Sequence, residues 1–152
     1  MEFLTPLTQT PSLPLLFVVS FLAATVLPLG SEWLLVLMIA QGFSITETVI
    51  AASVGNYVGS CTTFVIGLYG STFIINKVLR IDSTQLERAK RIYEKYGTWS
   101  LLMSWFPIIG DPICLVAGIF KVGWLRYSVL VFIGKFIRYA TVAYLAHKTI
   151  AL

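Results

Sequence analysis

Five polar side chains fall inside otherwise apolar stretches of this sequence: Glu32, Asn56, Asp111, Lys135 and Arg138. A charged side chain at the centre of a bilayer costs roughly 2.5–3.5 kcal/mol on insertion scales, so such residues usually serve a function. The formal charges of the two acids and the two cations sum to zero. We therefore expect the cations to face the acids, because an unpaired buried charge is costly. The Asn56 amide is predicted to join this cluster.

Two kinds of chemistry fit such a cluster. Burial raises the pKa of a carboxyl group and a nearby cation lowers it, so Glu32 or Asp111 can be tuned to bind and release a proton. Lys135 and Arg138 share a helix face at i, i+3, and they can instead bind an anionic headgroup while an acid is protonated. A third interpretation is a static charge network that only fixes geometry. The sequence leaves all three open.

The composition determines what kind of fold must position these residues. The chain has 152 residues, of which 57% are hydrophobic and 12% charged. Soluble domains carry about 25% charged residues, so we expect an all-α integral membrane protein forming a single domain over residues 1–152. The net charge of +4 reflects basic residues gathered in one loop and at helix ends. That distribution indicates membrane topology rather than nucleic-acid binding.

Two long apolar stretches are interrupted near their middles, at residues 13–43 and 99–120. The interruptions consist of prolines and glycines: Pro28, Gly30, Pro107, Gly110 and Pro112. The segments beside these breaks are too short to cross a hydrocarbon core of ~30 Å as helices. Each stretch is therefore a candidate re-entrant hairpin. Residues 46–75 and 127–148 are predicted to be spanning helices.

Basic residues predict the topology. Loop 76–97 is rich in Lys and Arg, so we expect it to be cytoplasmic. Within it, residues 83–97 are predicted to form a short amphipathic surface helix, with a capping box from Thr84 to Glu87 and an end at Gly97. Segment 121–126 is also basic. Both ends of 99–120 then lie on one side of the membrane, which favours a hairpin.

The two halves of the chain repeat this plan. Pro107 follows Pro28 by 79 positions, and the same offset aligns Asp111 with Glu32 and Gly134 with Gly55. A hairpin followed by a span, repeated from the opposite face, is an inverted-topology repeat. Transporters often use this plan and place their broken helices near the midplane. We therefore expect two opposed re-entrant hairpins.

The sequence resembles the DedA family, also called the SNARE-associated or VTT-domain group, and is most similar to its short YqaA-type branch. The resemblance runs from about residue 20 to 144. It is carried by LPLGSE at 27–32, GNYVGS at 55–60 and YEKYGTWSLLMSWFPIIGDPICLVAG at 93–118. It implies opposed hairpins in an inverted repeat, a bacterial inner-membrane location and a role in membrane homeostasis. Proton-linked transport and lipid flipping or scrambling are the implied activities.

One position differs from the family pattern. Members typically have an arginine before the aromatic-x-Pro motif and a second one shortly after it. Here Ser104 precedes the motif, and Asp111 occupies the later region. The resemblance assigns Glu32 to the family's acid in the first hairpin, and Lys135 and Arg138 are candidates to replace the missing cations.

We expect a proton-coupled transporter or lipid translocase. Its implied partners are protons, membrane lipids and an anionic headgroup, either of a phospholipid or of undecaprenyl phosphate. The alternative is a structural or partner-binding membrane protein that transports nothing. We expect no enzymatic activity, cofactor, metal or nucleic-acid partner, because the single His is near the C-terminus and metal-ligand motifs are absent from the sequence. The sequence leaves open whether copies associate.

Overall fold

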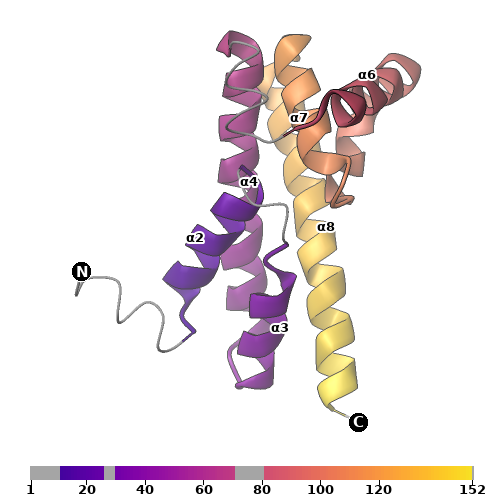
Figure 1. Ribbon diagram of the computed structural model, residues 1–152. Coiled ribbons are helices and arrows are strands. Elements are labelled where there is room, and N and C mark those ends of the chain that lie inside the picture. The colour runs from indigo at the N-terminus through magenta and orange to yellow at the C-terminus, as the bar shows by residue number, and fades with distance from the viewer. Residues whose placement is uncertain (1–10, 26–29, 71–80, 152) are drawn as a thin grey trace, which may run out of the picture.

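The computed structural model describes residues 11–25, 30–70 and 81–151, and these ranges contain helices and connecting turns without any strand. The helices are α2 (Leu13–Ala23), α3 (Glu32–Ala40), α4 (Ile45–Tyr69), α6 (Ser83–Tyr96), the 3-10 helix η1 (Gly97–Trp105), α7 (Gly110–Ile119) and α8 (Trp124–Ile150). Figure 1 shows this order. The prediction of an all-helical fold is confirmed for the described residues.

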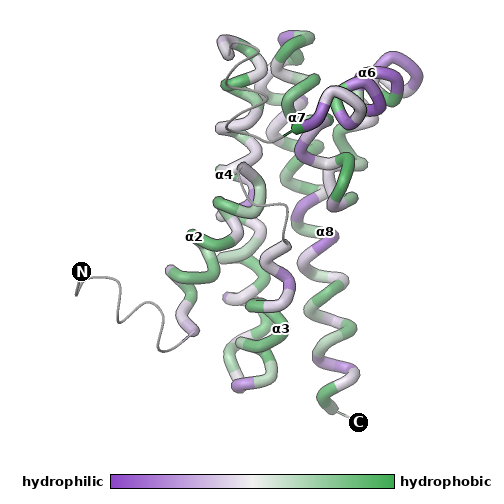
Figure 2. Tube along the Cα trace, in the orientation of Figure 1, coloured by the Kyte–Doolittle hydropathy of each residue, from purple (hydrophilic) through white to green (hydrophobic). Residues whose placement is uncertain are grey.

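Two helices are long and apolar enough to cross a membrane. α4 has 25 residues and α8 has 27, which correspond to about 38 and 40 Å at the helical rise. Both lengths exceed the ~30 Å hydrocarbon core. They run antiparallel beside each other, and Figure 2 shows apolar residues spaced along both, interspersed with neutral and hydrophilic ones. They occupy the segments predicted to span, although residues 71–75 lie outside the described ranges.

Each broken segment contributes one short helix to α4 and one to α8. From the first broken segment, α2 packs against α4 and α3 packs against α8. From the second, η1 packs against α8 and α7 packs against α4. α3 and α7 start near mid-height of the bundle and run toward opposite ends (Figure 1). Each long helix therefore carries one short helix from each broken segment.

Glycines allow these helices to approach closely. A Cβ added at Gly55 or Gly59 of α4 would collide with the backbone of α2, at the carbonyl oxygens of Phe17 and Phe21. Gly118 of α7 lies against α4 in the same way, and its added Cβ would collide with the α4 backbone. Small residues permit such contact between membrane helices. Small residues three and four apart in the sequence of 46–75 predict such packing, and the contacts of Gly55 and Gly59 confirm it.

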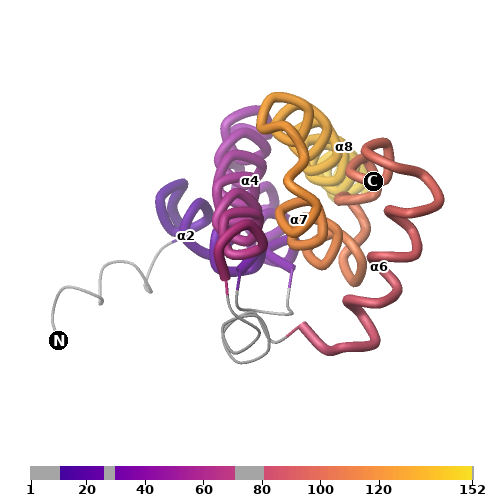
Figure 3. The backbone as a smooth tube through the Cα atoms, turned by 90° about the horizontal axis from the view of Figure 1, so that it is seen from above, coloured from indigo at the N-terminus to yellow at the C-terminus, as the bar shows by residue number. Residues whose placement is uncertain are grey.

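The polar helix α6 lies at the rim of the bundle (Figures 2 and 3). Its predicted cap is wrong by two residues. Asp82 is the N-cap and forms the capping box with Gln85, which accepts a hydrogen bond from the Asp82 N–H at 3.2 Å. Glu87 instead pairs with Arg91 one turn later, at 3.6 Å. The end is as predicted, because Gly97 has φ +61° and terminates the helix.

The second broken segment is not a pair of α-helical arms. Its first arm is a 3-10 helix, η1, followed by a turn that contains Pro107. α7 then begins at Gly110, and Pro112 fits its first turn, where a missing N–H leaves no intrahelical hydrogen bond unmade. In the first broken segment, Gly30 precedes α3, while Pro28 lies outside the described residues.

Candidate functional site

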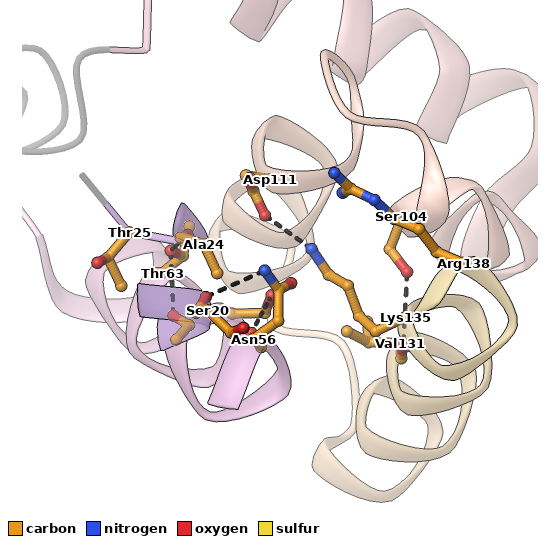
Figure 4. Close-up of polar contacts among 12 residues, drawn as sticks. Ser20, Ala24, Thr25, Asn56, Thr63, Ser104, Asp111, Val131, Lys135 and Arg138 are labelled. Carbon is orange, nitrogen blue, oxygen red and sulfur yellow. Dashed lines mark hydrogen bonds and ion pairs between the residues drawn. The ribbon is translucent and has the colours of Figure 1, made fainter. Parts of the chain in front are cut away.

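Two ion pairs connect the middle of α8 to the two short helices that follow the breaks. The Lys135 ammonium donates a hydrogen bond from Nζ to Oδ1 of Asp111 on α7 at 2.9 Å (Figure 4). The Arg138 guanidinium forms an ion pair with Glu32 on α3. The prediction that the two cations face the two acids is confirmed. A role of these residues in proton or substrate binding stays a prediction.

Both acids lie in the first turn of their helices. Glu32 is the first residue of α3, and Asp111 is the second residue of α7. The first turn of a helix has unpaired N–H groups and the positive end of the helix dipole, and both favour a carboxylate. Neither helix has a capping side chain at its N-cap residue. Each carboxylate therefore lies between a helix N-terminus and a cation of α8.

The cations are more deeply buried than the acids. The Lys135 side chain is 1% exposed and its partner Asp111 is 26% exposed. Arg138 is 12% exposed and Glu32 is 24% exposed. The ammonium of Lys135 therefore depends on Asp111 to offset its desolvation.

Asn56 has a different partner from the one predicted. Its amide Nδ2 donates to the backbone carbonyl of Ser20 at 3.1 Å, so it connects α4 to α2 and hydrogen-bonds to neither ion pair (Figure 4). Its Oδ1, and the hydroxyl of Ser53 one turn earlier, are buried without a hydrogen-bond partner among the described residues. The 79-residue offset of the repeat also aligns Asn56 with Lys135, but this alignment could not predict that α2 lies within reach of the amide.

A buried chain of hydroxyls next to the Glu32 pair was not predicted. The Ser20 hydroxyl donates to Ser31 Oγ at 2.8 Å, and Ser31 Oγ lies 2.7 Å from the Tyr139 hydroxyl. All three side chains are fully buried. Ser31 precedes Glu32 and Tyr139 follows Arg138 in sequence, so this chain of hydroxyl groups connects α2, α3 and α8 beside the ion pair. The signal in the sequence for these hydroxyl groups was that Ser31 and Tyr139 are direct neighbours of Glu32 and Arg138.

Ser104, at the position where the resemblance predicts an arginine, packs against α8. Its hydroxyl is buried and lies 3.5 Å from the Val131 carbonyl. A Cβ added at Gly134 would be 2.6 Å from the Ser104 hydroxyl. Lys135 is the next residue along α8, and its ammonium pairs with Asp111 of α7.

Comparisons with known proteins cover nearly all of the chain. The VTT domain matches residues 10–148. The inner membrane protein YqaA of Escherichia coli is 36% identical over 138 residues, covering 90% of this chain and 92% of that protein. A protein of Haemophilus influenzae is 34% identical over 147 residues, covering 91% and 89% of the two chains. No solved structure matches the chain.

Proposed function

The chain belongs to the VTT-domain family, also called the DedA family, of the bacterial inner membrane, and we propose that it is a proton-coupled transporter or lipid translocase. The observation that carries this proposal is the pairing of Asp111 with Lys135. Asp111 is partly exposed at the start of the short helix α7, and its carboxylate neutralises the buried ammonium of Lys135. Such a pair can bind a proton on the acid and an anion on the cation together.

The architecture proposed for this activity is an inverted repeat of two opposed re-entrant hairpins. Two observations support it. Each broken segment packs one short helix against α4 and one against α8, and α3 and α7 run from mid-height toward opposite ends of the bundle (Figure 1). The aligned glycines Gly55 and Gly134 add to it, because each lies against the first arm of its own half, α2 and η1. Broken backbone at membrane depth is tolerated where protein or a wet cavity surrounds it.

The proposed coupling between proton binding and anion binding follows from the cost of an unpaired buried charge. When Asp111 takes up a proton, it becomes neutral and the Lys135 ammonium loses its counter-ion. An anionic headgroup, of a phospholipid or of undecaprenyl phosphate, then restores neutrality at Lys135. When Asp111 releases its proton, the ion pair forms again and the headgroup leaves. Glu32 and Arg138 provide an equivalent pair on the other broken segment.

Lys135 takes the role of the arginine that the family pattern has at position 104. Ser104 leaves room for the close contact between η1 and α8 at Gly134, and the cation then comes from α8 instead of the hairpin. The site thus keeps a buried cation near the second break, with its side chain on a spanning helix.

A second function is favoured by a different observation. Each ion pair joins separate elements, α3 to α8 and α7 to α8, so the pairs can serve only to lock the short helices onto the long one. The protein would then be a structural or partner-binding component of the membrane. Buried ion pairs with such a role are known to fix geometry rather than to do chemistry.

Reconstituted liposomes with an imposed pH gradient distinguish the two functions. Transfer of phosphatidylglycerol or undecaprenyl phosphate would be measured for the unchanged protein, for Glu32→Gln and for Asp111→Asn. The exposed acid Glu47 provides the matched control, Glu47→Gln. The transporter proposal expects both site variants to insert and fold but to lose transfer, with the control active. Full transfer by both site variants would contradict it.

A charge swap tests whether the pair of Asp111 and Lys135 only locks α7 onto α8. Asp111→Lys combined with Lys135→Asp keeps a pair between α7 and α8 but removes the acid from the start of α7. If the swapped protein folds and regains full transfer, the pair is only a lock. If it folds without transfer, an acid is required at Asp111.

A further inference from the structure

A groove lies where the start of η1 meets the first turns of α8. It has a volume of about 430 Å³ and is lined by Thr98, Trp99, Leu125, Arg126, Val129 and Leu130. It is separate from the two ion pairs, whose α8 residues lie more than one turn further along the helix. We refer to it as the Arg126 groove.

The groove lies at the depth of lipid headgroups. α8 is about 40 Å long, roughly 10 Å more than the hydrocarbon core, so its first turn extends into the headgroup region. Trp99 is 69% exposed, and Trp124 at the start of α8 is 52% exposed. Exposed tryptophans are typical of the membrane–water interface. Amphipathic α6, at the same end of the bundle, also fits a surface position.

The lining combines one cation with an apolar wall. Arg126 is exposed and forms no ion pair with any residue in the described ranges. Leu125 and Val129 are 77% and 49% exposed, and Phe132 continues the same face of α8 toward the bilayer centre. A guanidinium suits a phosphate because it can donate two parallel hydrogen bonds. The apolar face suits a chain of methylene groups.

We propose that the Arg126 groove binds one anionic phospholipid of the surrounding leaflet, with its phosphate on Arg126 and one acyl chain along α8. Arg126 favours an anionic lipid over a zwitterionic one, since it has no acidic partner among the described residues and a zwitterionic headgroup brings its own cation. This site does not depend on the proposed transport activity. It holds a lipid against the protein and requires no movement of the ion pairs.

Native mass spectrometry of the purified full chain tests the site. Delipidated protein would be titrated with palmitoyl-oleoyl phosphatidylglycerol or with the phosphatidylcholine of the same chains. We expect one phosphatidylglycerol to be retained about fivefold more tightly than phosphatidylcholine, because the choline cation of phosphatidylcholine offsets its phosphate charge; this factor is the scale of the attraction between one basic residue and an anionic lipid. Arg126→Gln is expected to remove this preference. Val129→Trp is expected to exclude the lipid by filling the groove.

Arg88→Gln is the matched control, because it removes the same charge from exposed α6 outside the groove. It should keep the single tightly held lipid. Equal retention of the two lipids by the unchanged protein would overturn the proposal, as would an equal loss in Arg88→Gln and Arg126→Gln, or unchanged retention in Val129→Trp. A dimer that retains no lipid would identify a second copy as the occupant and would also overturn it.

Discussion

Lys135 and Arg138 lie one turn apart on α8, yet each is paired with an acid from a different short helix. Lys135 contacts Asp111 of α7, and Arg138 contacts Glu32 of α3. One turn of a single helix thus anchors both broken segments of the chain. A change at either cation is therefore expected to affect the position of one short helix and to leave the other in place.

The two ion pairs should differ in how much they stabilise the fold. Asp111→Ala leaves an ammonium that is 1% exposed without a counter-ion, and removal of one partner of a buried pair typically costs about 3–5 kcal/mol. Glu32→Ala is expected to cost less, because Arg138 is 12% exposed. Asp111→Asn should cost less than Asp111→Ala, since the amide oxygen still accepts from Lys135. Reversible unfolding in mixed micelles measures all three free energies.

The double variant Asp111→Ala with Lys135→Met provides the control for this comparison. Removing both charges is expected to recover most of the stability lost in Asp111→Ala, because no unpaired charge remains. An unfolding free energy of the double variant equal to that of Asp111→Ala would show that the loss comes from packing and not from the charge.

Gly118 should not tolerate even a methyl group. In Gly118→Ala the new Cβ would collide with the Phe64 carbonyl of α4, and overpacking of this kind typically costs about 1–3 kcal/mol. Gly123 has open space around it and is the N-cap of α8, so Gly123→Ala should cost only the smaller penalty of a poorer N-cap, about 0.5 kcal/mol. Thermal unfolding midpoints in detergent compare the two. Equal midpoints would contradict the close contact of α4 and α7.

The start of α6 can be tested at its two candidate caps. Asp82→Ala is expected to destabilise α6 by about 1 kcal/mol because it removes the N-cap acceptor. Thr84→Ala should have little effect, since Thr84 is exposed and lies inside the helix. Amide hydrogen exchange of residues 85–88 measures the difference. Faster exchange in the Thr84 variant alone would indicate a helix that starts later.

The sequence was sufficient to predict features that follow from large local costs. Buried charges require partners, so Lys135 and Arg138 had to meet Glu32 and Asp111. The end of α6 at Gly97 was predictable too, because the residue there adopts a positive φ. The glycines of α4 were predictable as packing sites, since small residues in an apolar helix have few other uses.

Other features depend on contacts between distant parts of the chain. The 3-10 geometry of η1 accompanies the close approach of Ser104 to Gly134, which no local pattern encodes. Tyr139 appears in the sequence as an ordinary aromatic residue of an apolar helix, and its hydroxyl finds Ser31 only in the folded protein. Two overlapping four-residue segments, Asp82–Gln85 and Thr84–Glu87, could each form the capping box of α6, and the sequence did not determine which one does so.

The side of the membrane on which each connection lies decides whether the second broken segment crosses. Positive charge predicts that residues 84 and 123 share the cytoplasmic side and that residue 41 lies on the other. Single cysteines at Thr84, Gly123 and Gln41, all exposed, would be placed in a chain with Cys61 and Cys114 replaced by alanine. A membrane-impermeant maleimide would then be added to spheroplasts and to inverted vesicles.

We expect Thr84→Cys and Gly123→Cys to react in inverted vesicles only, and Gln41→Cys to react in spheroplasts only. Residues 99–120 would then leave the membrane on the side where they enter it, which requires a hairpin. Labelling of Thr84→Cys and Gly123→Cys from opposite sides would show that η1 and α7 together cross the bilayer. The inverted repeat would then fail, because its two halves must contain the same number of crossings.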